Sequence, residues 1–141
     1  MSQVKKYSAE FFKSLQKVKG ALSIKVNDVA ENFPLIHAEI RERYISLHFD
    51  MSEGSGFNSF IGLVINEDAL SKKIELPSNS VYLQFQDPTA EPPQEWLASS
   101  GWVRVEWEES SGRIQGLMNF RSDNGDYAVL EDGKFDVTIS P

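Results

Sequence analysis

The sequence predicts a mainly β protein: an antiparallel β-sandwich or flattened β-barrel of about 8–10 strands with one N-terminal α-helix. Three observations indicate this class. Short runs of alternating apolar and polar residues recur along the chain, turn-forming residues separate them, and a helical pattern is confined to the N-terminal segment. Because the chain has 141 residues, 40% of them hydrophobic, we expect a single domain over residues 1–141.

The N-terminal segment is predicted to form a helix over about residues 8–19. Ser8 is a suitable N-cap and Gly20 a natural stop. Apolar residues recur at helical spacing at Tyr7, Phe11, Leu15 and Val18, with Phe12 widening the stripe. We expect the stripe to pack against the sheet, the alternative being that this lysine-bearing amphipathic helix faces a membrane or a partner.

The rest of the chain, residues 21–139, is predicted to be all-β. The strands expected in its first part are residues 21–29, 35–41, 44–51, 57–65, 74–76 and 81–86. Turns or loops separate them at residues 32–34, 42–43, 52–56, 66–73 and 77–79, with one helical turn near residues 67–70. The run 57–65 is apolar on both faces, which is typical of a central strand.

The second and third of these strands are expected to pair as an antiparallel hairpin around Glu42-Arg43, although a single long bent strand is an alternative. Its core face would match the following residues across the turn: Ile36, Ala38 and Ile40 with Ile45, Leu47 and Phe49. The outer face then sets His37 directly opposite His48, with Glu39 one step along. Two imidazoles and a carboxylate can hold a divalent metal, so His37, His48 and Glu39 are candidate metal ligands, two ordinary strand histidines being the alternative.

The last forty residues are predicted to form four strands joined by three tight turns. The first hairpin sets these residues opposite each other: Glu108 and Arg113, Trp107 and Ile114, Glu106 and Gln115, Val105 and Gly116, and Val103 and Met118. Asn124-Gly125 predicts the second turn. A three-residue third turn at Glu131-Asp132-Gly133 would set Val129 against Phe135 and Tyr127 against Val137.

A proline-rich segment, residues 87–100, precedes these strands, and Pro93 is expected to start one helical turn through Leu97. Trp102 faces away from the core by strand parity, beside this segment. The residues predicted to form a partner-binding surface are Tyr82, Gln84, Pro92, Pro93, Trp96 and Trp102. The alternative is that Trp96 folds over Trp102 and covers the second sheet face.

The charge balance narrows the classes of partner. Lys and Arg total 14 against 21 Asp and Glu, a formal net charge of -7, which disfavours nucleic acid. The chain has no cysteine, which excludes disulfides and thiol ligands or nucleophiles. Since it has no signal-peptide pattern and no run of ~20 apolar residues, we expect a cytoplasmic protein that does not insert in membranes.

The closing strands resemble the C-terminal motif of uncharacterised bacterial all-β, sandwich-like proteins. The matching residues are Ile114-Gln115-Gly116 through Phe120, then Val129 and Gly133 to Val137. This covers about a quarter of the chain. The resemblance implies an antiparallel sandwich and a bacterial origin, and no activity or site residue. Those relatives carry signal sequences, which this sequence lacks.

No nucleophile constellation, P-loop or dinucleotide motif is present, and we expect no cofactor. The function predicted is a non-catalytic binding protein for a protein partner, of the adaptor or immunity type. One alternative is a β-barrel carrier or sensor for a small apolar ligand. The other is an enzyme, a hydrolase or a metal-dependent one. The sequence does not predict an oligomeric state.

Overall fold

The computed structural model describes residues 17–50, 59–87, 94–124 and 126–140. The elements are β1 (Lys17–Val26), β2 (Val29–Ile40), β3 (Tyr44–Asp50), β4 (Phe60–Asn66), the 3-10 turn η2 (Glu67–Ala69), β5 (Ile74–Leu76), β6 (Val81–Asp87), β7 (Gln94–Glu108), β8 (Arg113–Asn124) and β9 (Asp126–Ser140). Within the described residues η2 is the sole helical element, so the protein is mainly β as predicted.

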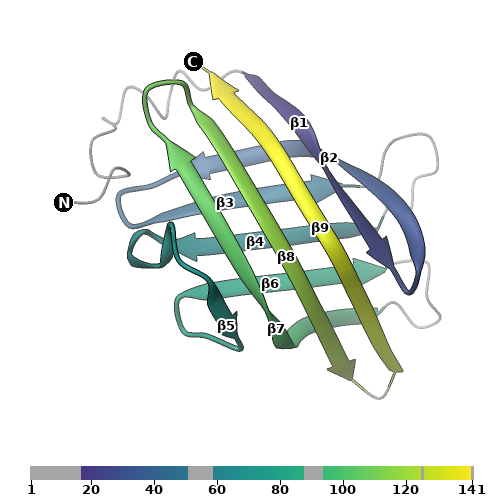
Figure 1. Ribbon diagram of the computed structural model, residues 1–141. Helices are drawn as coiled ribbons and strands as arrows, with labels where there is room; N and C mark the ends of the chain where they lie inside the picture. The colour runs from purple at the N-terminus through teal and green to yellow at the C-terminus, as the bar shows by residue number, and fades with distance from the viewer. Residues whose placement is uncertain (1–16, 51–58, 88–93, 125, 141) are drawn as a thin grey trace.

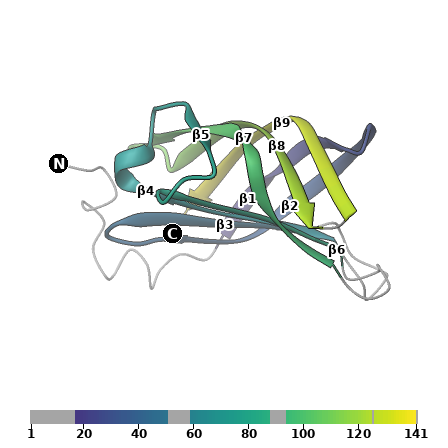
Figure 2. The same cartoon turned by 90° about the horizontal axis from the view of Figure 1, so that it is seen from below.

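The strands close into an eight-stranded antiparallel barrel. Each strand pairs with its neighbour in the order β7-β6-β4-β3-β2-β1-β9-β8, and the pairing of β7 with β8 completes the ring. The short strand β5 is an addition on the edge of β7. Figures 1 and 2 show that the barrel is flattened into two layers, with β7, β8, β9 and β1 in front and β3, β4 and β6 behind. Of the two predicted architectures, the flattened barrel is the one observed.

Apolar side chains from every strand fill the interior. The alternation is regular in β3 and β4, where every second residue is buried and the others are partly exposed. The ring centroids of Phe49 and Phe135, from the back and front layers, lie 5.2 Å apart. Both rings are fully buried. They meet across the middle of the barrel, as expected for an eight-stranded ring whose interior side chains can fill.

The register predicted for the β7–β8 hairpin is confirmed. Cα partners are Val103 and Met118, Val105 and Gly116, Trp107 and Ile114, and Glu108 and Arg113. The inward residues are buried, Trp107 among them. A slip by one residue would turn the apolar set to solvent, which explains why the alternation alone fixed this pairing.

The predicted third turn at Glu131-Asp132-Gly133 is wrong. β9 continues through these residues, and β8 pairs Met118 with Gly133 and Phe120 with Leu130. The extra residues form a bulge, in which Asp132 has φ 55°. Val129 and Tyr127 consequently pair with β8, and neither faces Phe135 or Val137. Asp and Gly tolerate the positive φ of a bulge as readily as that of a turn. Their presence alone therefore does not distinguish a bulge from a turn.

The predicted break at Asn32-Phe33-Pro34 is also wrong, because β2 runs through it. The turn lies earlier, at Asn27 and Asp28, which have φ 49° and 71°. Phe33 is fully buried. Pro34 occupies the last pair of the β1–β2 ladder, opposite Ala21, where its missing N–H interrupts no further pair.

The hairpin around Glu42-Arg43 is confirmed against the bent-strand alternative, since the Arg41 N–H donates to the Tyr44 carbonyl at 2.8 Å. One core position differs. A register shift between Leu35 and His37 gives Leu35 the buried place opposite Phe49 and leaves Ile36 52% exposed. A register shift of this kind cannot be predicted from the alternation of apolar and polar residues.

Two helical predictions fail where they can be compared. Residues 17–19, the end of the predicted N-terminal helix, belong to β1, and Gly20 continues the strand with φ 121°. The rest of that helix lies outside the described residues. Residues 94–97, predicted as a helical turn, begin β7. The predicted strands at 74–76 and 81–86 and the helical turn near 67–70 are confirmed, whereas the loop at 52–56 and Gly125 lie outside the described residues.

On the outer side of β8 and β9, Arg113 donates to both carboxylate oxygens of Asp136, at 2.9 and 2.6 Å, and lies opposite Glu108 as predicted. These hydrogen bonds hold the pKa of Asp136 below its ordinary value of 3.8. A carboxyl with a depressed pKa stabilises the fold above its unfolded-state pKa, and this contribution is lost as the pH falls through the folded-state value.

Asp136→Asn is therefore expected to lower the free energy of unfolding slightly at neutral pH, since the pair is exposed. The difference from the unsubstituted protein should shrink as the pH falls below the ordinary Asp pKa, 3.8. Urea unfolding of both proteins across this range measures it. A difference that stays constant with pH would show that the ion pair is not its source.

Candidate functional site

The strands β2, β3, β4 and β6 and the first part of β7 align one outward row of residues. The register places His37 opposite His48, His48 opposite Gly62, Gly62 opposite Gln84, and Gln84 opposite Leu97. We call the outer surface centred on this row the Gly62 face. Its members are Tyr44, Ser46, His48, Asp50, Phe60, Gly62, Val64, Asn66, Tyr82, Gln84, Gln86 and Leu97.

Gly62 forms a shallow recess at the centre of this face. A Cβ atom built on Gly62 would lie 3.9 Å from the Gln84 Oε1 atom and 3.9 Å from the Phe60 Cε1 atom, with no nearer atom among the described residues. Leaving this position without a side chain lets another molecule's group approach the sheet backbone.

One wall of the recess is a pair of stacked rings. His48 and Phe60, on neighbouring strands, have centroids 4.5 Å apart and planes inclined by 24°. The imidazole Nε2 also lies 3.6 Å from the Asp50 Oδ2 atom. The Asp50 Oδ1 atom is buried and has no hydrogen-bond partner among the described residues. A buried carboxylate oxygen without a donor is costly, so this corner of the face favours an incoming N–H or ammonium group.

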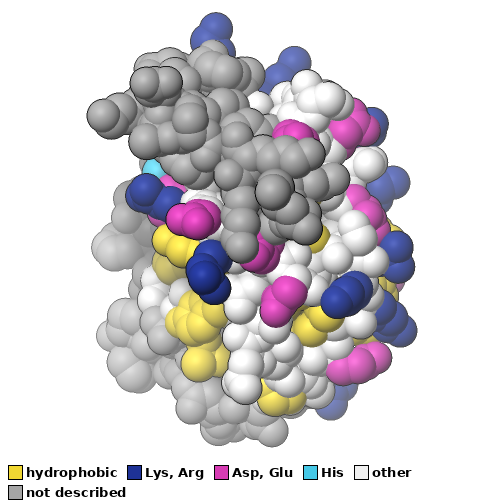
Figure 3. Space-filling view, turned by 90° about the vertical axis from the view of Figure 1, so that its left-hand side faces the viewer, with side chains coloured by type: hydrophobic (Ala, Val, Ile, Leu, Met, Phe, Trp, Pro, Cys, Tyr) yellow, Lys and Arg dark blue, Asp and Glu magenta, His cyan; other side chains and the backbone are white. Residues whose placement is uncertain are grey.

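The Gly62 face carries little charge. Among the described outward residues of β3, β4 and β6, Asp50 is the one Asp, Glu, Lys or Arg. Tyr82 and Leu97 are 47% and 51% exposed and lie diagonally across neighbouring strands. Figure 3, viewed along the side where the two layers meet, shows a group of hydrophobic side chains with charged side chains beside it and scattered over the rest of this side.

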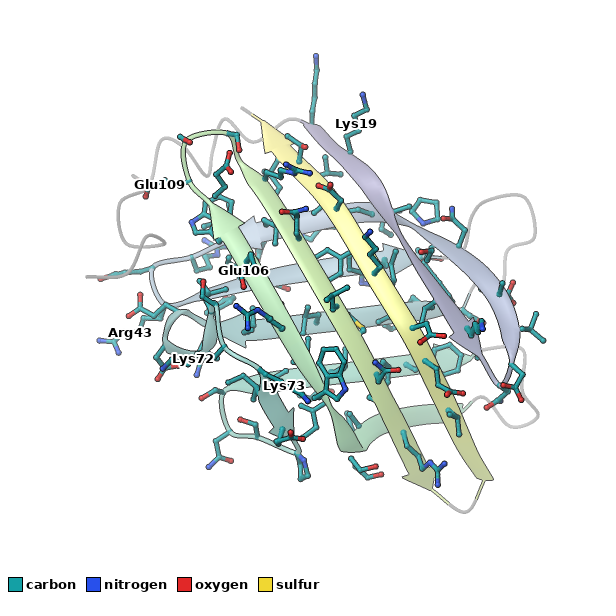
Figure 4. The ribbon with its side chains drawn as sticks, viewed as in Figure 1. Lys19, Arg43, Lys72, Lys73, Glu106 and Glu109 are labelled. Carbon is teal, nitrogen blue, oxygen red and sulfur yellow. The ribbon has the colours of Figure 1, made fainter. Side chains whose placement is uncertain are left out.

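The front layer, by contrast, pairs its charges internally. Arg104 donates to Glu106 at 2.7 Å, and the Ser71 hydroxyl donates to the same carboxylate at 2.8 Å. The Ser71 bond is the main cause that lowers the pKa of Glu106, with Arg104 adding to it. In Figure 4 Glu106 lies along β7 and Lys73 lies near β5 and β7. A surface whose ions already have partners offers less to a ligand than the Gly62 face does.

The predicted metal ligands are brought together only in part. His37 and His48 are Cα partners as expected. Glu39, however, accepts a hydrogen bond from Arg41 at 2.8 Å, and the carboxylate beside His48 is Asp50. In the described parts of the chain, no group of three or more His, Asp and Glu side chains is placed to hold a metal ion.

The predicted partner surface is divided between the two layers. Tyr82 and Gln84 belong to the Gly62 face. Trp102 lies on the front half of β7, between Glu75 and Asn119, with the Lys73 ammonium 5.0 Å from its ring. Trp96 is on the back half of β7, where its backbone is opposite Phe85. Pro92 and Pro93 lie outside the described residues.

Sequence reasoning missed the central part played by Phe60, Gly62 and Leu97. The signal available was that residues 57–65 are apolar on both faces, with a glycine in the run. This pattern predicts a central strand that is buried on both faces. β4 is indeed central in its layer, but its outer side is covered by no described element.

Comparison with known proteins finds no matching family model, no similar curated protein and no similar solved structure. The resemblance to bacterial all-β proteins therefore stays a prediction. Among the described residues, no helix combines the length and apolar character needed to cross a membrane.

Proposed function

We propose that the protein is a non-catalytic binding protein that holds a protein partner on the Gly62 face. The observation that carries this proposal is the aligned row from His37 to Leu97, with a recess at Gly62 and Asp50 as the one charged residue among the described outward residues of β3, β4 and β6. Interfaces are depleted in charged residues at their centres and enriched in aromatic ones. Tyr82, Phe60 and His48 supply the aromatic surface, and Gln84 supplies an amide for orientation.

The chemistry of the face indicates what the partner presents. A small apolar or aromatic side chain fits the Gly62 recess between the ring pair and Gln84. A cation beside it would satisfy the buried Asp50 oxygen. The net charge of -7 would steer such a basic segment toward the protein. We therefore expect the partner to contribute an amphipathic, positively charged segment.

The filled interior supports a surface function over the carrier alternative. Phe49 and Phe135 meet in the middle of the barrel, where a carried molecule would have to lie. An enzyme would need a base and a nucleophile placed together. On the Gly62 face the titratable pair is His48 with Asp50. The neighbouring hydroxyls of the described residues are those of Ser46, Tyr44 and Tyr82, and none of them forms a hydrogen bond with His48 or Asp50.

Tyr82→Glu and Leu97→Glu are each expected to weaken partner capture about tenfold or more, because they place a charge inside the contact. The test is capture from extracts of the source cell with each variant immobilised, followed by identification and direct titration of the captured protein. Leu117→Glu is the matched control, since Leu117 is similarly exposed, at 45%, on the front layer.

The proposal requires that the control bind as the unsubstituted protein does. Equal titration curves for all three variants would place the partner elsewhere. Loss of binding only in the Leu117 variant would assign it to the front layer. Thermal unfolding of each variant checks that the barrel is intact.

A further inference from the structure

We infer that residues 1–16 of the same molecule dock on the Gly62 face and compete there with the partner. The inference rests on the proposed function only in that both use this face. The segment has the amphipathic, cationic character that the face favours: its large apolar residues are Tyr7, Phe11, Phe12 and Leu15, its cations are Lys5, Lys6 and Lys13, and its one acidic residue is Glu10.

The segment joins the barrel close to the face. Because β1 and β2 are antiparallel, β1 starts at the barrel end where β2 stops at Ile40 and β3 begins at Tyr44. The β1–β2 ladder begins only at Ala21, so among the described strands residues 17–20 pair with β9 alone. From Lys17 the chain needs to cross two strand spacings, about 10 Å, to reach β3.

The length of residues 1–16 is also close to the length of the Gly62 face along β3. Sixteen residues would extend about 24 Å as a helix. The seven residues of β3 extend about 23 Å. Three extended residues would cover the crossing of about 10 Å and the other thirteen would span about 20 Å as a helix, so the segment can run along most of the face from its Tyr44 end toward Asp50.

An apolar track leads from the attachment point to the recess. Ile36, turned outward by the register shift in β2, is 52% exposed and lies between the start of β1 and His37. The stacked pair of His48 and Phe60 comes next, and Tyr82 follows beyond Gly62. A stripe of four large apolar side chains matches this series of exposed apolar groups in both kind and extent.

Charge favours the same arrangement. The face offers the buried, unpartnered Asp50 oxygen to a lysine. On the adjoining strand β2, Arg41 is already paired with Glu39. Lys19 projects from β1 and away from the barrel in Figure 4. The lysines of residues 1–16 can supply an ammonium group to Asp50 from the same molecule.

The absence of cysteine makes a direct test simple, because one introduced thiol can carry a nitroxide. The label is placed at Gln86→Cys, on the rim of the Gly62 face, and separately at Leu117→Cys on the front layer as control. We expect the amide signals of residues 1–16 to be broadened by the first label and not by the second. Phe11→Asp should restore them, because it puts a charge into the apolar contact.

Three outcomes would overturn the inference. The first is equal broadening of residues 1–16 by the two labels, and the second is broadening by neither label. Broadening could instead arise between molecules, which a mixture of spin-labelled chains with isotope-labelled, unmodified chains would detect; the occupant would then be a second copy. If broadening fails while Tyr82→Glu still abolishes capture, the proposed function stands alone. If the segment docks but Tyr82→Glu leaves capture unchanged, the inference stands without the proposed function.

Discussion

Replacing Phe135 by alanine is expected to lower the free energy of unfolding by about 3–5 kcal/mol, a large fraction of what a domain of this size possesses. Phe135 is 1% exposed, and its ring meets Phe49 in the middle of the barrel. Neighbouring strands are hydrogen-bonded on both sides, so the walls cannot move inward to fill the space. Urea unfolding monitored by circular dichroism measures the loss.

Gly116 provides the control for this interpretation. A Cβ atom on Gly116 would lie 2.2 Å from two carbons of the Phe135 ring, so Gly116→Ala should cost about 1–3 kcal/mol by overpacking. In the Phe135→Ala background the same substitution should be neutral or stabilising, because the ring is gone. Additive effects in the double variant would mean that the ring does not occupy the space above Gly116.

Gly101→Ala is expected to cost about 3 kcal/mol or more, the second of the two largest effects. Gly101 has φ 117°, outside the range that residues with a Cβ adopt readily. The new Cβ would lie 2.1 Å from the Asn119 carbonyl oxygen and 2.6 Å from the Phe120 Cα atom. Both are backbone atoms of β8, which a side-chain rotation cannot relieve. Thermal and urea unfolding measure the effect.

Gly62→Ala is the matched control, since it places the same methyl group on a strand of the same barrel. Gly62 has no positive φ, and in the part of the chain that the structure describes its new Cβ would meet nothing closer than 3.9 Å. We expect no loss of stability, and a gain of up to about 1 kcal/mol from reduced chain entropy. If Gly101→Ala were as harmless as Gly62→Ala, the bend of β7 at Gly101 could not have the conformation described.

The parts of the fold that could be predicted are those in which one face of a strand is buried. The β7–β8 register followed from alternation alone, because every inward residue from Val103 to Trp107 has one buried partner. Bulges were not predictable. At Asp132 and at Ile36 a single extra residue shifts the alternation. The position of that residue depends on how the strand fits against a neighbouring strand.

For the candidate site, the sequence predicted the His37–His48 juxtaposition and the outward position of Tyr82 and Gln84. It did not predict that these fall on one surface. That depends on the order β2-β3-β4-β6-β7, which joins local hairpins into a single row. Trp102 was expected beside them, but β7 changes layers between Leu97 and Trp102, so a contiguous sequence is divided between two sides of the molecule.

The pairing of β1 with β9 has a consequence for how the chain folds. Lys17 pairs with Ser140, and the Asn27 side chain accepts a hydrogen bond from a backbone N–H 102 residues away, at Val129. The hairpins between β2 and β6 connect residues close in sequence and can form early. Ring closure joins the first and last strands of the barrel, so it is expected to be slow and to occur last. During synthesis, β1 can pair with β2 early, but its other edge must wait for β9, which begins more than 100 residues later.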